Sequence, residues 1–187
     1  VWWSGLISYL FKFDKKFKKI LTSKNKNPIQ IDEKFLEEYL ESHNKEEIYK
    51  KSRAYYGEFA TLSDLKSASL MSNVFFGNHL YNHFNSTVLS EHDLNYQYNK
   101  NRDLLNEYDN SLEYFSYPFG QKKTCYNKKT NSMIKLLGAK KIFTANAINY
   151  NINQDILHRV SVKNDIQDIN RLKSHIILSQ VKNYFIS

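Results

Sequence analysis

The first 60 residues alternate apolar and polar positions with a helical period. Apolar side chains from Trp2 to Leu21 recur three or four positions apart, with lysines between them, which is typical of an amphipathic helix. After a polar run, Asp32 is placed to cap a second helix that begins EKFLEEYL. A third helical stretch covers roughly 46–58. We therefore predict a helical subdomain or insertion over residues 1–60.

Beyond residue 60 the pattern changes to short apolar runs separated by helical ones. The runs NVFFG, EYFSYPFG, KKIFTAN and ILHRVSV have the length and composition of buried strands. Helices are predicted between them, one capped by Ser90 and one ended by Gly138, and a closing helix is predicted over 165–184. Such alternation is typical of an α/β layer or barrel with parallel strands. We predict this α/β part over residues 61–187.

The amino-acid composition is typical of a folded protein, but it does not identify a binding partner. Hydrophobic residues make up 41% of the chain and charged residues 25%, so extensive disorder is not expected. The net charge of +8 can favour nucleic acid, anionic membranes or acidic polymers. The lysines are spread along the chain, however, and no nucleic-acid-binding motif occurs. We therefore expect no nucleic-acid partner.

The amino-terminal stretch carries no targeting signal. VWWSGLISYLFKF lacks a basic start and a small-residue cleavage site, and its apolar run is too interrupted to span a membrane. No transmembrane segment is expected, and both the cytoplasm and the cell envelope stay open as compartments. Because the chain begins with Val rather than Met, we expect a processed product or a fragment. Cys125 is the only cysteine, which excludes an internal disulfide and a thiolate metal cluster.

Two histidines follow the first predicted strand, in FFGNHLYNHFN. His79 and His83 are four residues apart, so a helical turn would point both imidazoles the same way, and neutral ring nitrogens can hold a zinc ion. An isolated pair with this spacing is more often structural than metal-binding. Its place at the carboxyl end of a predicted strand favours a site, because α/β folds build their sites there.

A second candidate segment is FSYPFG, at the end of the second predicted strand. Pro118 and Gly120 predict a sharp exit from the strand, which would expose the backbone N–H groups of Phe119 and Gly120. Such groups can face a developing oxyanion. A plain strand-ending turn explains the same residues.

Taken in order, these segments resemble the polysaccharide deacetylases with NodB homology, carbohydrate esterase family four. FFGNHLYNHFNSTVLSEHDL resembles the second motif of that family, and FSYPFG resembles the third. LLGAKKIFTAN and ILHRVSV resemble the strands that follow, and VWWSGL is similar to a helical insertion that some members carry. The resemblance covers most of the chain and is strongest over 61–162. Four ordered matches are far more specific than the histidine pair alone.

The resemblance implies a fold and an activity. The expected fold is a partial distorted (β/α) barrel of the NodB-homology type with an N-terminal helical insertion. The expected activity is a metal-dependent hydrolase that removes acetyl groups from the N-acetylated sugars of a polysaccharide or glycan. The expected cofactor is Zn²⁺ or another divalent transition metal, with His79 and His83 as its two imidazole ligands.

The resemblance also assigns roles around the third motif. The backbone N–H of Phe119 would help to hold the oxyanion, and Tyr117 and Pro118 would shape the substrate-binding wall. Arg159 would orient the catalytic carboxylate, or would pair with an acidic group that only packs the barrel. His158 lies near the expected general acid and is a candidate for that role.

The sequence departs from the family pattern at its first motif. Thr-Phe-Asp-Asp-Gly, which supplies the base and the metal-binding aspartate, does not occur in the 187 residues, and FKFDKKF around Asp14 lacks the second Asp and the Gly. We expect the chain to start downstream of that motif. Ser116 also stands where many members have arginine. A catalytically inactive carbohydrate-binding module fits the missing aspartates equally well, and a basic nucleic-acid-binding protein is the third hypothesis.

Overall fold

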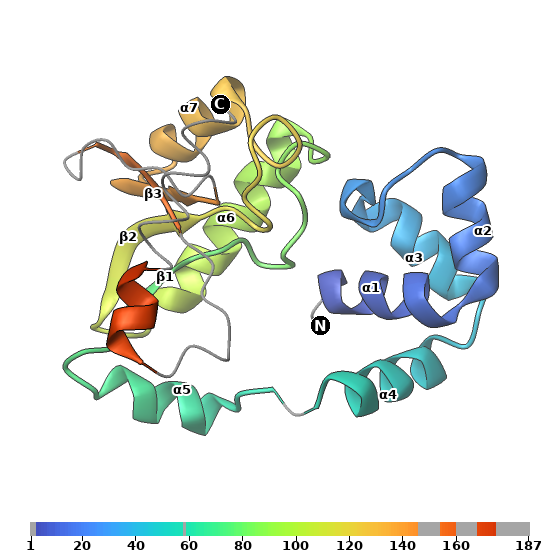
Figure 1. The fold of residues 1–187 in the computed structure, drawn as a ribbon, viewed down its shortest axis with the longest axis horizontal. Coiled ribbons are helices and arrows are strands. Elements are labelled where there is room, and N and C mark those ends of the chain that lie inside the picture. Colours follow the sequence, from blue (N-terminus) through green and yellow to red (C-terminus); the bar gives the residue numbers. More distant parts are fainter. Residues whose placement is uncertain (1–2, 58, 146–153, 160–167, 175–187) are drawn as a thin grey trace.

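The computed structural model of the protein describes residues 3–57, 59–145, 154–159 and 168–174. It contains a lobe of helices from the amino-terminal part and a lobe built on a β-sheet, which lie side by side (Figure 1). The elements are α1 (Trp3–Phe13), α2 (Lys15–Ser23), η1 (Pro28–Gln30), α3 (Glu33–Glu41), α4 (Lys45–Tyr56), α5 (Leu62–Ser69), β1 (Phe76–Asn78), α6 (Glu91–Leu105), β2 (Ser111–Ser116), α7 (Lys128–Leu136), β3 (Lys141–Thr144) and β4 (Ile156–His158).

The first predicted helix is two helices, because Asp14 interrupts it. Asp14 has an extended backbone (φ −100°, ψ 105°), and its carboxylate accepts hydrogen bonds from the N–H groups of Lys16 and Phe17 at 2.9 and 3.1 Å. A carboxylate in this position caps the start of a new helix. The Tyr39 hydroxyl donates to its other oxygen at 2.6 Å. This contact ties the break between α1 and α2 to α3, a tertiary link that the periodicity of the sequence does not reveal.

The helical lobe has its own apolar core, and one side chain from the sheet lobe belongs to it. The cap predicted at Asp32 is confirmed, since its carboxylate accepts from Phe35 N. Phe84, from the histidine segment, packs into this core with its ring 6.1 Å from that of Trp3. The two lobes are therefore joined by buried apolar contact. The buried members are Trp3, Leu6, Ile7, Leu10, Phe17, Leu21, Ile31, Leu36, Tyr39, Leu40 and Phe84.

The sheet has four parallel strands in the order β1-β2-β3-β4. Residues Phe115 of β2 and Ile142 of β3 pair in register and are fully buried. Buried side chains of α6 (Leu94, Tyr98) and α7 (Ile134) pack against them in one cluster. The predicted α/β class with parallel strands is thus confirmed.

The start of α6 and the end of α7 lie where the local sequence predicts them, whereas α6 ends at Leu105, several residues earlier than its sequence pattern suggests. Ser90 accepts a hydrogen bond from Asp93 N and caps α6. Gly138 follows α7 with φ +109°, a left-handed conformation that glycine adopts without strain. Of the closing helix predicted over 165–184, the structure describes residues 168–174, of which 169–174 are helical. The last residues of the ILHRVSV run, from 160 on, lie outside the described part.

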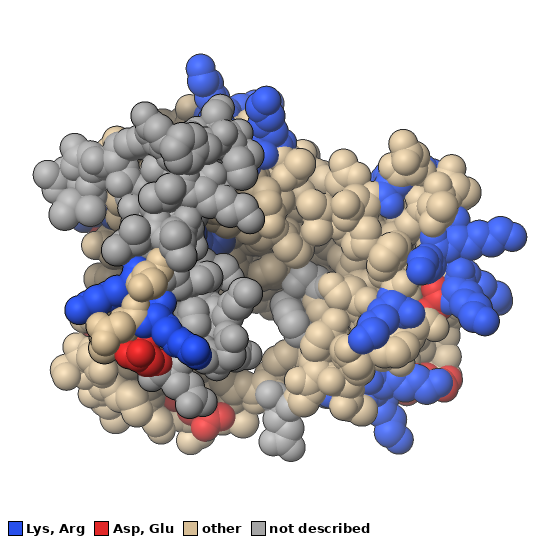
Figure 2. Space-filling view, viewed as in Figure 1, with Lys and Arg blue, Asp and Glu red and all other residues tan. Residues whose placement is uncertain are grey.

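The lobes are connected by α4 and α5, which run along the lower edge of the molecule in Figure 1. The boundary predicted near residue 60 falls between these two helices and stays a prediction. Lysine and arginine side chains gather over the helical lobe, on the right in Figure 2. Across the residues that the structure describes, none of the helices has the length and apolar character needed to cross a membrane.

Candidate metal centre

The residues singled out in the sequence lie at the carboxyl ends of the parallel strands. His79 follows β1, Ser116 ends β2 and leads into the Phe119 turn, and Arg159 follows β4. Because parallel strands end at a common edge, three segments far apart in the sequence are brought to one place. Among the described residues, this edge is where the predicted site residues gather.

The histidine pair lies on a loop and not on a helix. Leu80 and His83 have left-handed backbones, with φ of 63° and 58°, so a regular helical turn cannot form. The rings of His79 and His83 still meet, with centroids 4.6 Å apart and planes at 75°. The predicted proximity of the imidazoles therefore holds, and its structural cause is different from the one expected.

Buried amide side chains hold the loop in this unusual conformation. Asn78 Oδ1 accepts from Leu80 N at 3.0 Å, and its Nδ2 donates to Tyr98 O at 2.8 Å. Asn82 N donates to Gln97 Oε1 at 2.8 Å. These amides were not among the site residues predicted from the sequence. The repeated Asn in GNHLYNHFN could have indicated them, because Asn side chains readily form hydrogen bonds with nearby backbone groups in turns.

Both histidines are held neutral. His79 Nδ1 lies 2.5 Å from the carbonyl oxygen of Ser116, and since a carbonyl only accepts, Nδ1 carries the proton and Nε2 keeps its lone pair. Burial lowers the pKa of His79, the hydrogen bond to Ser116 partly opposes this shift, and the Arg159 charge adds to it. Burial, and then His79, lower the pKa of His83 to about 4. Neutral imidazole is the form that binds metal.

The pair fits a metal ion as two of its ligands. His83 Nδ1 is buried and makes no hydrogen bond to any residue that the structure describes. A backbone carbonyl that fixes the tautomer of a ligating histidine, as Ser116 does for His79, is common at metal sites. No third His, Cys, Asp or Glu joins the pair within the described ranges. The described residues thus provide a two-histidine partial site.

The turn after β2 is tightly folded around Phe119. Phe119 has φ 62°, and Gly120 N donates to Pro118 O at 2.7 Å, which closes a γ-turn. The N–H of Gly120 is therefore not available as the second oxyanion donor that the sequence suggested. The N–H of Phe119 makes no hydrogen bond to the part of the chain that is described. Its ring packs edge-on against His83 with centroids 5.2 Å apart.

Arg159 and Tyr117 brace this turn. Arg159 Nη2 donates to the Tyr117 carbonyl at 2.9 Å, so the guanidinium supports the turn that carries Phe119. The Tyr117 side chain is fully buried, with its hydroxyl 2.9 Å from Asn131 Oδ1 and its ring stacked on Tyr126. Pro118 is buried as well. Any part that Tyr117 and Pro118 play in a substrate wall is therefore indirect, through the shape of the turn.

His158 stands beside Thr144 on the neighbouring strand. Its Nδ1 makes a short hydrogen bond with the Thr144 hydroxyl. Burial, and then the charge of Lys122, lower its pKa. A role as general acid stays a prediction.

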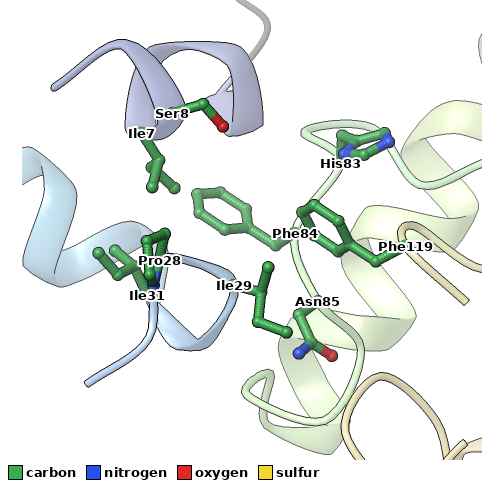
Figure 3. Close-up of a pocket in the computed structure, with 9 residues that line it drawn as sticks. All are labelled: Ile7, Ser8, Pro28, Ile29, Ile31, His83, Phe84, Asn85 and Phe119. Atoms are coloured by element: carbon green, nitrogen blue, oxygen red, sulfur yellow. The ribbon is translucent and has the colours of Figure 1, made fainter. Parts of the chain in front are cut away.

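A small cavity adjoins His83 on the side of the helical lobe (Figure 3). Its volume is about 20 Å³, room for roughly one water molecule. Ile7 and Ser8 of α1 face it from one lobe, and His83, Phe84 and Phe119 face it from the other. The helical lobe therefore forms one wall of the candidate site.

Comparisons of this chain with protein-family models, curated protein sequences and solved structures found no match.

A first prediction concerns the dependence of stability on pH. The folded protein keeps His83 neutral down to a pKa of about 4, whereas an ordinary histidine takes up a proton near 6.5. As the pH falls from 6.5 towards 4, this histidine becomes protonated in the unfolded chain but stays neutral in the folded chain. The free energy of unfolding therefore declines. We expect the His83→Gln variant to show a shallower decline in urea unfolding over this range. Equal slopes in the variant and the parent would contradict the assigned environment.

A second prediction concerns Glu33, which joins the helical lobe to the histidine loop. Its carboxylate accepts from Asn82 Nδ2 at 2.8 Å and from Gln97 Nε2 at 3.3 Å. Glu33→Ala leaves these amides without their acceptor, and we expect a loss of about 1–3 kcal/mol in stability and weaker zinc binding by about 10-fold. The measurements are urea unfolding and calorimetric zinc titration.

Two further variants complete the Glu33 test. Glu33→Gln keeps an acceptor oxygen and is expected to recover most of the zinc affinity. Glu38→Ala, on the exposed side of α3, is the matched control, since its ion pair with Lys34 is long at 4.0 Å. Equal zinc affinity in Glu33→Ala and Glu38→Ala would show that Glu33 does not position the loop.

Proposed function

We propose that this chain carries the histidine ligands and the oxyanion turn of a metal-dependent hydrolase that removes acetyl groups from the N-acetylated sugars of a polysaccharide or glycan. One observation carries the proposal. Two neutral imidazoles meet at the carboxyl edge of a parallel sheet, beside a turn whose backbone N–H is unpaired in the described structure. The order of the matching sequence segments supports the same function.

The strand order supports the finer fold proposal, a partial distorted (β/α) barrel with an N-terminal helical insertion. Consecutive parallel strands are neighbours in the sheet, as they are in a (β/α) barrel. Doubly wound sheets instead reverse their order at a switch point. The helical residues before α5 would be the insertion, and they cover the site through α1.

His79 and His83 would hold Zn²⁺ or another divalent transition metal. When bound, such an ion lowers the pKa of a water molecule and polarises a carbonyl oxygen. The chain contributes by keeping both imidazoles deprotonated and by aiming His79 through its bond to Ser116. Rigid aiming of this kind removes the need to reorganise when substrate arrives.

Phe119 would act on the acetamide oxygen of the substrate, and Arg159 would act on the turn that carries Phe119 and on a catalytic carboxylate. The Phe119 N–H can donate to that oxygen as it gains negative charge, which is where a fixed donor lowers the barrier most. Arg159 holds the Tyr117 carbonyl and so fixes the turn. Its charge would also orient a catalytic carboxylate, as the resemblance implies. His158 is the candidate that would protonate the leaving amine.

A catalytically inactive carbohydrate-binding module is the second candidate. Two observations favour it: the sequence has no Thr-Phe-Asp-Asp-Gly, and no acidic residue joins the histidine pair within the described ranges. Such a module would bind N-acetylated glycan through the same edge of the sheet and would release no acetate.

Acetate release from a hexamer of N-acetylglucosamine tests the proposal. The assay uses zinc-loaded protein, both this chain and any longer natural form of the polypeptide that carries the aspartate motif. We expect release by the form with the aspartates and none after His79→Ala. Full activity in His79→Ala would overturn the metal-centre assignment. Glycan binding without release in every form would favour the binding module.

A further inference from the structure

A second concave site lies on the helical lobe, separate from the histidine pair. It is an open groove of about 410 Å³ between the second half of α1 and the start of α4. Tyr9 and Phe13 line it from α1, Lys15 and Lys16 from the start of α2, and Lys51 from α4. None of the sequence motifs described above accounts for this groove.

The groove lies in the most basic stretch of the chain. Residues 12–26 contain seven lysines and one carboxylate, Asp14. Asp14 is occupied by the cap of α2 and by the Tyr39 hydroxyl. Glu47, which also lines the groove, is paired with Lys51 at 2.6 Å. The positive charge of Lys15 and Lys16, both exposed, is therefore not balanced by these carboxylates.

Aromatic rings stand exposed beside these lysines. Phe13 and Tyr55 are 49% and 46% exposed, and their centroids are 4.9 Å apart. Tyr9 packs against both of them. Lys12 Nζ donates to the Tyr55 hydroxyl at 2.6 Å and helps to hold that ring in place. Solvent-exposed aromatic rings beside a groove are typical of binding surfaces. Their electron-rich faces attract the C–H groups of a sugar ring.

We propose that this groove binds an acidic glycan, and that the substrate of the candidate site is therefore a polysaccharide with carboxylated sugar units. The second clause rests on the function proposed above. Lys15 and Lys16 would pair with the carboxylates, and Phe13 and Tyr55 would pack against the sugar rings. Helix α1 links the two sites, because Ile7 and Ser8 line the cavity beside His83 while Tyr9 and Phe13 line the groove.

The lining favours a glycan over a nucleic acid. The carboxylates of Asp14 and Glu47 line the groove beside the lysines, and their hydrogen bonds within the protein leave their negative charges in place. A nucleic acid carries a phosphate on every unit, which would meet these two carboxylates with repulsion. A polymer with a carboxylate on every second unit has fewer such conflicts.

Calorimetric titration with three probes tests the inference. The probes are a hexasaccharide that alternates glucuronate with N-acetylglucosamine, a neutral hexamer of N-acetylglucosamine, and a single-stranded DNA hexamer. We expect the acidic hexasaccharide to bind at least about 10-fold more tightly than either other probe, and more weakly as salt is raised. The double variants Phe13→Ala/Tyr55→Ala and Lys15→Gln/Lys16→Gln should each weaken it about 10-fold. Their side chains are exposed, and thermal melting confirms that each variant is folded.

Control variants separate this inference from the metal centre. Phe75→Ala and Lys66→Gln, exposed residues outside the groove, should bind like the parent. His79→Ala should also keep its affinity for the acidic hexasaccharide, whatever becomes of its zinc binding and activity. Parent-like affinity in both groove variants would overturn the groove assignment and leave the metal centre untouched. Tighter binding of DNA than of the acidic hexasaccharide would overturn the choice of ligand.

Discussion

Replacing His79 with alanine is expected to lower the zinc affinity of the chain by at least about 100-fold, and His83→Ala is expected to do the same. The two rings are neutral and in contact, so each can give a lone pair to one ion without first losing a proton. With either ring removed, one strong ligand remains. Calorimetric titration with zinc measures the loss.

The matched control for this prediction is His92→Ala. His92 lies on α6 with its side chain 91% exposed, so its removal takes away an imidazole without touching the candidate site. We expect zinc affinity equal to that of the parent. Losses of similar size in all three variants would indicate nonspecific binding by surface histidines and would contradict the site.

The second large effect is expected at Gly120. Its φ of +83° is strained for any residue with a side chain, and an added Cβ would lie 2.7 Å from Arg159 Nη2 and 3.0 Å from Ala145 N. Gly120→Ala should therefore destabilise the protein by about 2–4 kcal/mol, from the backbone conformation and the overpacking together. The displaced guanidinium would also release the Tyr117 carbonyl, so the Phe119 turn should loosen.

Gly138→Ala separates the two contributions. Gly138 also has a positive φ, +109°, at the end of α7, but nothing lies within 4 Å of an added Cβ. Its replacement should cost only the conformational part, about 1–2 kcal/mol. Urea unfolding of both variants gives the comparison. An equal loss of stability at the two positions would show that Gly120 is not in close contact with Arg159.

Features set by nearby residues could be predicted from the sequence. The caps at Asp32 and Ser90 form because a side-chain oxygen accepts a hydrogen bond from the backbone N–H three residues on. The alternation of strands and helices follows from apolar periodicity, and the parallel sheet follows from that alternation. The convergence of His79 and Phe119 at one edge was predictable for the same reason.

Features set by distant residues could not be predicted in this way. The contact that ties Asp14 to α3 comes from Tyr39, 25 positions away, and the loop at Asn82 is held by Glu33, 49 positions away. Phe84 belongs to the histidine segment in the sequence, but its side chain packs into the core of the helical lobe. The sequence pattern around each of these residues does not indicate a contact partner so far away along the chain.

In the candidate site, too, some features could be predicted from nearby residues and others could not. Pro118 and Gly120 indicate a sharp turn, yet only the structure shows that the N–H of Gly120 is used within it. The spacing of His79 and His83 would bring them together on a helix, whereas the structure brings them together through left-handed residues held by buried amides.

The zinc K-edge X-ray absorption spectrum of the chain loaded with one equivalent of zinc tests the central claim most directly. Imidazole ligands produce a characteristic multiple-scattering pattern, from which their number is fitted. We expect two imidazole ligands in the parent and one in His83→Ala. A parent spectrum without imidazole scattering, or the same number of imidazoles in the parent and in His79→Ala, would contradict it.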